Sequence, residues 1–234
     1  MSTRAATAPL AQRPSTARSG APVAPALVLA AALAIGLAWG AATSGLQTLL
    51  PSSGLANAVG PWVAAAFAVG ALSRRPGVAM VAGVLACAGE VGGYYLVSAA
   101  RGFGVNPSMV ALWAVSAVVG GPVFGAAGWC WRRARSVRWA ALGAALLGGV
   151  FLAEGVVQYG VVLGYTGNAV VFCTLGVLLA VLLGATSPAV RTAGPRARGV
   201  GAAAAWLGVV LLAGATGIGA MAWVVDQLFN PLAR

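Results

Sequence analysis

The stretch "VAMVAGVLACAGEVGGYYLV", Val78–Val97, is a run of 20 residues in which Glu90 carries the only charge. An α-helix needs about 20 mostly apolar residues to cross the ~30 Å hydrocarbon core of a bilayer, so this stretch predicts a transmembrane helix. The whole chain of 234 residues is 60% apolar and 7% charged. A soluble domain carries about a quarter charged residues. The composition therefore predicts an integral membrane protein.

Six further apolar stretches predict an all-α fold, a polytopic transmembrane bundle of about seven helices with six as the alternative. The expected spans are Pro25–Leu46, Ala56–Leu72, Val78–Val97, Ser108–Ala127, Trp139–Gln158, Ala169–Ala185 and Gly201–Val224. Residues 22–228 form the bundle in this interpretation. Residues 1–21, rich in Ala, Ser, Thr, Pro and Arg, form a disordered cytoplasmic tail, and residues 229–234 form a short external tail.

The arginines predict the orientation of the chain. All 14 basic residues are Arg, and all but Arg101 and Arg234 fall in the N-terminal tail or in the links after the second, fourth and sixth expected helices. Cytoplasmic loops carry an excess of Lys and Arg, so we expect the N-terminus inside and the C-terminus outside. Heavy Ala, Gly, Val and Arg use without Lys is typical of GC-rich codons. This pattern favours the plasma membrane of a bacterium.

The net charge of +11 therefore belongs to one membrane face. Anionic lipid attracts arginines placed there, so we expect the bilayer as a partner and no nucleic acid. The tryptophans agree with two aromatic belts, with Trp129, Trp131 and Trp139 at the inner ends and Trp62 and Trp223 near the outer ones.

The carboxylates share one level of the predicted bundle. Glu90 lies 15 residues beyond Arg75, or about 22 Å from the inner edge, and Glu154 lies 16 residues beyond Arg138. Both therefore fall in the outer half of the hydrocarbon core. Asp226 lies near the outer end of the last expected helix.

Other polar side chains follow at the same level. Tyr94 is one turn beyond Glu90, and Gln158 stands in the same relation to Glu154. A charged carboxylate facing lipid costs about 2.5–3.5 kcal/mol, so both glutamates are expected to face the bundle interior or a wet cavity. The candidate ligand-binding residues are Glu90, Tyr94, Glu154, Gln158 and Asp226.

Two functions remain open at this stage. In the first, the acids line an outward-facing polar cavity of a small-solute transporter or of its substrate-binding subunit, and bind a cationic or proton-coupled solute. In the second, they hydrogen-bond between helices of a non-catalytic scaffold or partner protein, and other membrane subunits are possible partners in both. Convergence of the polar groups on one cavity favours transport, and dispersal onto separate helix contacts favours a scaffold.

An enzyme is not expected. The chain contains no His and no Lys, which removes the usual general base and common metal ligands. The three cysteines are isolated in apolar runs and are expected to be packing residues. We therefore expect no cofactor, no metal and no catalytic residue.

Glycine-rich motifs carry a family resemblance. The pairs Gly36–Gly40 and Gly121–Gly125 predict close helix contacts. The stretches "LANAVGPWVAAAFAVGALSRRP", "GGYYLV", "GGPVFGAAGW" and "GGVFLAEG" resemble an uncharacterised family of multi-pass membrane proteins from high-GC Gram-positive bacteria, over roughly Leu27 to Trp223. That resemblance implies no activity. The chain is also similar, more loosely, to the substrate-binding subunits of energy-coupling-factor vitamin transporters, which are small bundles with an outward-open site.

Overall fold

The computed structural model describes residues 24–49, 54–55, 58–193 and 201–208, and a few single positions from 211 to 220. The described elements are α1 (Pro25–Leu49), α2 (Val59–Leu72), α3 (Pro76–Ala100), α4 (Pro107–Arg133), α5 (Val137–Ala153), the π-helix η2 (Glu154–Val162), α6 (Thr166–Thr186) and α7 (Pro188–Ala193). Residues 201–208 are also helical. No strand occurs in these parts of the chain, so the predicted all-α class is confirmed there.

Five of the described helical stretches are long and apolar enough to cross a membrane. They are α1, α3, α4, the continuous stretch Val137–Val162, and α6. The chain is therefore a membrane protein, as its composition predicted. The seventh expected span and both expected tails lie wholly or partly outside the described residues, and the position of the C-terminus lies outside them too.

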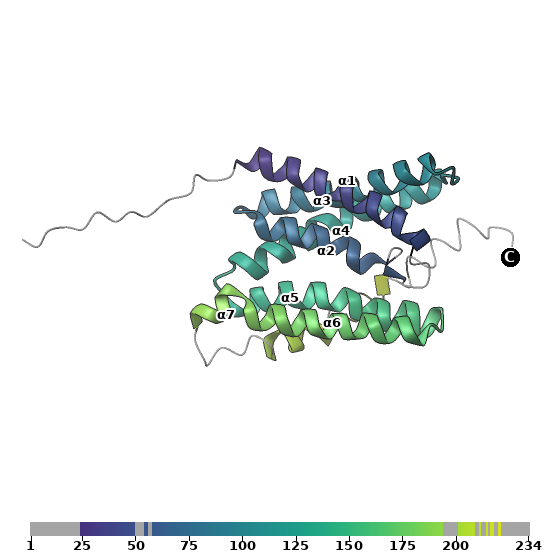
Figure 1. Ribbon diagram of the computed structural model, residues 1–234. Coiled ribbons are helices and arrows are strands. Elements are labelled where there is room, and N and C mark those ends of the chain that lie inside the picture. The colour runs from purple at the N-terminus through teal and green to yellow at the C-terminus, as the bar shows by residue number, and fades with distance from the viewer. Residues whose placement is uncertain are drawn as a thin grey trace, which may run out of the picture.

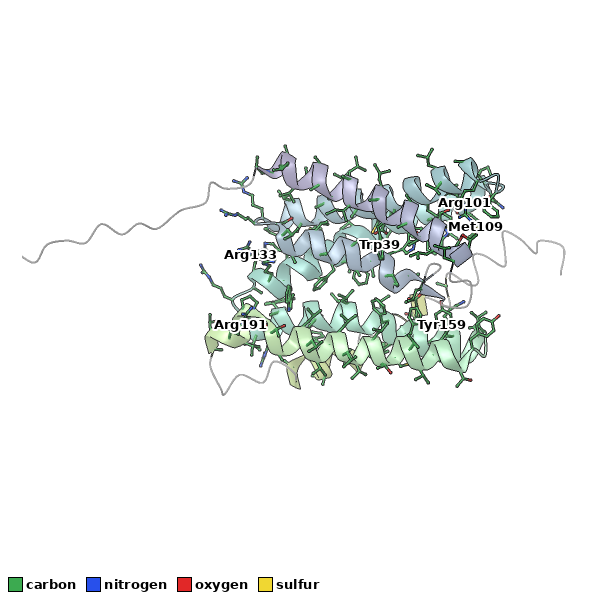
Figure 2. The ribbon with its side chains drawn as sticks, in the orientation of Figure 1. Trp39, Arg101, Met109, Arg133, Tyr159 and Arg191 are labelled. Atoms are coloured by element: carbon green, nitrogen blue, oxygen red, sulfur yellow. The ribbon has the colours of Figure 1, made fainter. Side chains whose placement is uncertain are left out.

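The helices run side by side, alternating in direction (Figure 1). α1 packs on α3, both α2 and α3 pack on α4, and α4 connects this group to the pair α5 and α6. The short α7 follows α6 after Ser187, in the arginine-containing link after the sixth expected span. The arginines gather accordingly: Arg133 and Arg191 lie at one end of the bundle, and Arg101 lies at the other (Figure 2).

The predicted glycine contacts are confirmed. A Cβ atom on Gly40 of α1 would lie 2.0 Å from the carbonyl oxygen of Glu90 on α3, and one on Gly36 would lie 2.1 Å from that of Ala86. A Cβ atom on Gly125 of α4 would meet Ala79 of α3 at 2.2 Å. Small residues let helix backbones approach closely where lipid supplies no hydrophobic driving force.

Helix α2 is too short to cross the bilayer. Its 14 residues extend about 21 Å, against the ~30 Å hydrocarbon core. Its C-terminal end lies beside the arginine-rich link, so its N-terminus starts part-way through the bundle. Ala56–Leu72 was expected as a span, and the structure corrects this because the helix begins only at Val59.

The fifth expected span, Trp139–Gln158, lies within the continuous helical stretch Val137–Val162, but the type of helix changes along it. The α-helix ends at Ala153, and nine residues of π-helix follow from Glu154. A π-helix closes i→i+5 hydrogen bonds and often occurs at functional sites. The spans begin where local chemistry predicts: Asn106 accepts hydrogen bonds from the backbone N–H groups of Ser108 and Met109, and Pro107 opens α4.

Candidate functional site: the Glu90 pocket

Glu154 binds the N-terminus of α2. Its two carboxylate oxygens accept hydrogen bonds from the backbone N–H groups of Val59 and Gly60, each at 2.6 Å. A helix opens with four N–H groups that have no partner within the helix, and buried N–H groups need partners from elsewhere in the chain. Pro61 has no N–H to satisfy. The Glu154 side chain, at the junction of α5 and η2, therefore satisfies most of the free N–H groups at the N-terminus of α2, which is buried in the bundle.

The π-helix places a second polar group against the same segment. The Tyr159 hydroxyl donates to the carbonyl oxygen of Gly54 at 2.9 Å, and Gly54 has a φ of 64°, which favours glycine. Residues five apart lie close to one face of a π-helix, but about 140° apart on an α-helix. The π-helix η2 thus points the side chains of Glu154 and Tyr159 in a similar direction, toward the first residues of α2 and the segment just before it. Gln158, four residues from Glu154, is half-buried.

Glu90 lies in a different place, a cavity of about 370 Å³ between α2, α3 and α4. Small-molecule sites have volumes of roughly 300–1,000 Å³. The lining residues include Val59, Trp62 and Val63 of α2, Cys87, Glu90 and Val91 of α3, and seven residues of α4 between Trp113 and Phe124. We call this cavity the Glu90 pocket. Its walls are otherwise almost wholly apolar.

Two polar groups in the Glu90 pocket have no protein partner. Glu90 is fully buried, and neither of its carboxyl oxygens is hydrogen-bonded by any residue the structure describes. The indole Nε1 of Trp62 is likewise buried without a partner among those residues. A buried polar group left unsatisfied costs about 1–3 kcal/mol, and such groups are rare enough to need an explanation.

Aromatic rings stand beside this carboxyl. The ring of Trp62 is 5.8 Å from the ring of Trp113, measured between centroids, and 5.7 Å from the ring of Tyr94. Tyr94 exchanges hydrogen bonds with the side-chain amide of Gln47 on α1, at 2.9 and 3.1 Å. Trp62 was expected in an interfacial belt, and instead it packs inside the bundle because α2 starts so deep.

A second cavity lies on the other side of Tyr94. It has a volume of about 440 Å³ and includes Gln47, Tyr94, Arg101, Asn106 and Met109 in its lining. We call it the outer vestibule, because Arg101 and Met109 lie at the end of the bundle opposite Arg133 (Figure 2). The Arg101 guanidinium donates to the carbonyl oxygen of Ser44 and stacks 4.9 Å from the Phe103 ring centroid.

The structure thus separates the predicted site residues. Glu90 lines the Glu90 pocket, and Tyr94 lines the outer vestibule. Glu154 holds the start of α2, and Gln158 lies on η2 and lines neither cavity. Asp226 lies outside the described residues. No three His, Cys, Asp or Glu side chains group together as a metal site in the described chain.

Three residues of this region were missed by the sequence interpretation. Trp62 and Trp113 line the same cavity as Glu90, and Tyr159 rather than Gln158 bonds, like Glu154, to the segment at the start of α2. The shortness of the apolar stretch before Ser73 was a signal that α2 starts inside the bundle. Nothing local to the sequence indicated a π-helix at Glu154.

The fold and the site together define a class of protein. It is an all-α membrane protein with a buried carboxyl in an apolar pocket between its helices. A family model described as a family of unknown function (DUF6518) matches residues 19–225. The chain belongs to this family, which agrees with the predicted resemblance to an uncharacterised family. No curated protein and no solved structure matches the chain, and the likeness to energy-coupling-factor subunits gains no support from these comparisons.

Proposed function

We propose that the Glu90 pocket binds a small, largely apolar solute that carries an amine, and that the protein is a transporter of this solute or the substrate-binding subunit of one. The observation that carries the proposal is the Glu90 carboxyl, which is fully buried in a cavity and has no partner among the described residues. The sequence suggested a single polar cavity around both glutamates. We now place the binding site in the Glu90 pocket alone.

The chemistry of the walls favours an ammonium group. A carboxylate and an ammonium form a charge-assisted hydrogen bond, which is stronger than a neutral one. Tryptophan faces attract cations, with about 0.5–2 kcal/mol per contact. The rings of Trp62 and Trp113 line the same cavity as Glu90. The remaining apolar lining accommodates a hydrocarbon body.

Binding of a cation at Glu90 is linked to release of the proton from the Glu90 carboxyl. An ionised carboxylate without a partner is costly in an apolar cavity, so the carboxyl keeps its proton until a cation compensates the negative charge. Binding of an alkylammonium then forms the ion pair and releases that proton from Glu90. This linkage supports a solute–proton exchange.

The start of α2 inside the bundle favours a transporter over other binding proteins. Discontinuous helices near the membrane midplane form the sites of many secondary transporters. Val59, the first residue of α2, lines the Glu90 pocket. The arginine asymmetry supports an orientation with the N-terminus inside, since the described arginines of three links share one end of the bundle.

The proposal is tested by binding of decylamine to the purified protein in lipid nanodiscs. A decylamine that carries a photoreactive diazirine should label α2 or α4 peptides that line the Glu90 pocket, and unlabelled decylamine should compete. Truncating one member of a buried charge pair costs about 2–5 kcal/mol, so E90Q should weaken binding by roughly 30-fold or more.

The control is V177A, a change on α6 at a residue that lines neither cavity, which should keep the labelling. Diazirine-bearing decanol tests the amine, because it shares the chain without the charge and should label weakly. Equal labelling of wild type and E90Q would contradict the proposal.

A structural scaffold is the second candidate, and a specific observation favours it. Glu154 is engaged in a helix contact, and so is Tyr94, whose hydroxyl is bonded to Gln47 of α1. In a scaffold, Glu90 would be a buried carboxyl without a ligand. The same decylamine experiment separates the two functions, since a scaffold shows no labelling that depends on Glu90.

A further inference from the structure

The Glu90 pocket opens on the flank of α4. Of its lining residues, Val115 and Val119 are exposed, at 62% and 66%, and the others are buried or half-buried. These two valines lie 8 and 12 residues beyond Pro107, or about 12–18 Å along the helix axis. That depth falls inside the hydrocarbon layer, and both side chains are apolar. The opening therefore faces lipid tails.

The outer side of the Glu90 pocket is closed by aromatic rings. Trp62 packs against Tyr94 on one side and Trp113 on the other, with centroids 5.7 and 5.8 Å apart. The Tyr94 hydroxyl is held by Gln47 at 2.9 Å. Tyr94 lines the outer vestibule and Trp62 lines the Glu90 pocket, so their contact separates the two cavities.

The charge of the outer vestibule also opposes entry from that side. Arg101 lines the outer vestibule and lies at the outer end of the bundle (Figure 2). A guanidinium repels an approaching ammonium by Coulomb's law. An amine that came from outside water would have to pass this charge and then separate Trp62 from Tyr94. The flank of α4 presents neither obstacle.

We infer that the Glu90 pocket takes its ligand from the bilayer, through the opening at Val115 and Val119. This inference rests on the proposed amine site and specifies the ligand further: an amphiphilic amine that partitions into the membrane. The apolar body slides between α4 and the lipid, and the ammonium reaches Glu90. Small amines confined to water are excluded, because they do not reach the opening.

The route is tested by the rate of photolabelling in proteoliposomes after mixing with diazirine-bearing decylamine. V119W places a large side chain at the opening and should slow labelling by about one order of magnitude or more, within the range over which association rates vary among mutants of one site. V177W is the matched control: Val177 is 49% exposed on α6 and lines neither cavity, so the rate should stay at the wild-type value.

The outer vestibule is blocked independently. M109C, coupled to a bulky membrane-impermeant maleimide, fills the outer vestibule and should leave the rate unchanged. A wild-type rate in V119W, or slow labelling after the M109C block, would overturn the lateral route. The dependence on Glu90 would persist in either case, so the proposed amine site would stand. Loss of all labelling that depends on Glu90 would instead remove the proposed function and this inference with it.

Accessibility gives a readout that does not require V119W to fold. In a chain with Cys87, Cys130 and Cys173 replaced by alanine, V119C and V177C should both react with a lipid-soluble alkyl maleimide. Decylamine should slow the reaction of V119C and leave that of V177C unchanged. A V119C variant that stays unreactive while V177C reacts would show that the opening is covered, and would overturn the inference.

Discussion

Two glutamates that the sequence predicts at one level of the bundle have opposite surroundings. Glu154 satisfies two backbone N–H groups, whereas Glu90 has no hydrogen-bond partner among the described residues. Hydrogen bonds to a charged group contribute about 1.5–3 kcal/mol each, while an unsatisfied buried group costs about 1–3 kcal/mol. Glu154 therefore stabilises the fold and Glu90 destabilises it. A residue kept at such a cost is expected to serve binding.

This contrast predicts the stability of two Gln variants. E154Q exchanges a carboxylate that accepts at both oxygens for an amide that accepts at one. We expect it to lower the free energy of unfolding by about 2–3 kcal/mol. E90Q breaks no hydrogen bond to any residue that the structure describes and should melt close to wild type. Thermal unfolding in detergent measures both; an E90Q variant less stable than E154Q would reverse the assignment.

At the scale of elements, glycine contacts set where Glu90 lies. α1 touches α3 at Gly40, directly against the Glu90 backbone, so α1 holds the backbone that carries this carboxyl. The same geometry connects α3 to α4 at Gly83 and Gly121, where a Cβ atom on Gly83 would lie 2.0 Å from the Gly121 carbonyl oxygen. The walls of the Glu90 pocket are therefore positioned by close contacts between small residues of α1, α3 and α4.

A single methyl group tests this contact. G40A places a Cβ atom 2.0 Å from the Glu90 carbonyl oxygen, which forces α1 and α3 apart. Overpacking of this kind costs about 1–3 kcal/mol. G45A is the matched control on the same helix, because a Cβ atom there meets nothing within 4 Å. G45A should be neutral or slightly stabilising, since Ala favours a helix over Gly by roughly 0.5–1 kcal/mol.

Melting temperatures of G40A and G45A in detergent provide the measurement. We also expect G40A to weaken decylamine labelling, since the shift moves Glu90 relative to Trp62. Equal stability of the two variants would mean that α1 does not approach α3 this closely.

At the scale of the whole molecule, the distribution of arginines distinguishes the two ends of the bundle. Links at one end carry Arg74, Arg75, Arg132, Arg133, Arg135 and Arg191, and Arg101 lies at the opposite end. This arrangement arises because successive helices alternate in direction. It holds even though α2 does not extend to the end of the bundle where Arg101 lies. From the positive-inside rule we propose that the arginine-rich end is cytoplasmic.

Reporter fusions test this topology. Fusions after Arg75, Arg135 and Arg196 should give cytoplasmic signals, and a fusion in the α3–α4 loop at Gly104 should give an external one, because positive charge retains a loop inside. A C-terminal fusion should also report outside if residues 201–224 cross the bilayer. A cytoplasmic C-terminus would contradict the odd number of crossings.

The sequence by itself determined the membrane class, the positions of most helices and the glycine contacts. These features are local or periodic, since a bilayer imposes the same length and polarity on each helix. The asparagine cap of α4 at Asn106 follows from the same kind of local chemistry.

Only the tertiary structure decided which acid has a partner. The bonds from Glu154 to Val59 and Gly60 join residues 95 and 94 positions apart. They depend on where α2 begins and on the π-helical turn after Ala153, and neither follows from apolar periodicity. The meeting of Trp62, Tyr94 and Trp113 likewise requires three helices to pack. Side chains predicted at the same depth are equivalent in a sequence. Neighbours from other helices make Glu154 a structural anchor and leave Glu90 without a hydrogen-bond partner among the described residues.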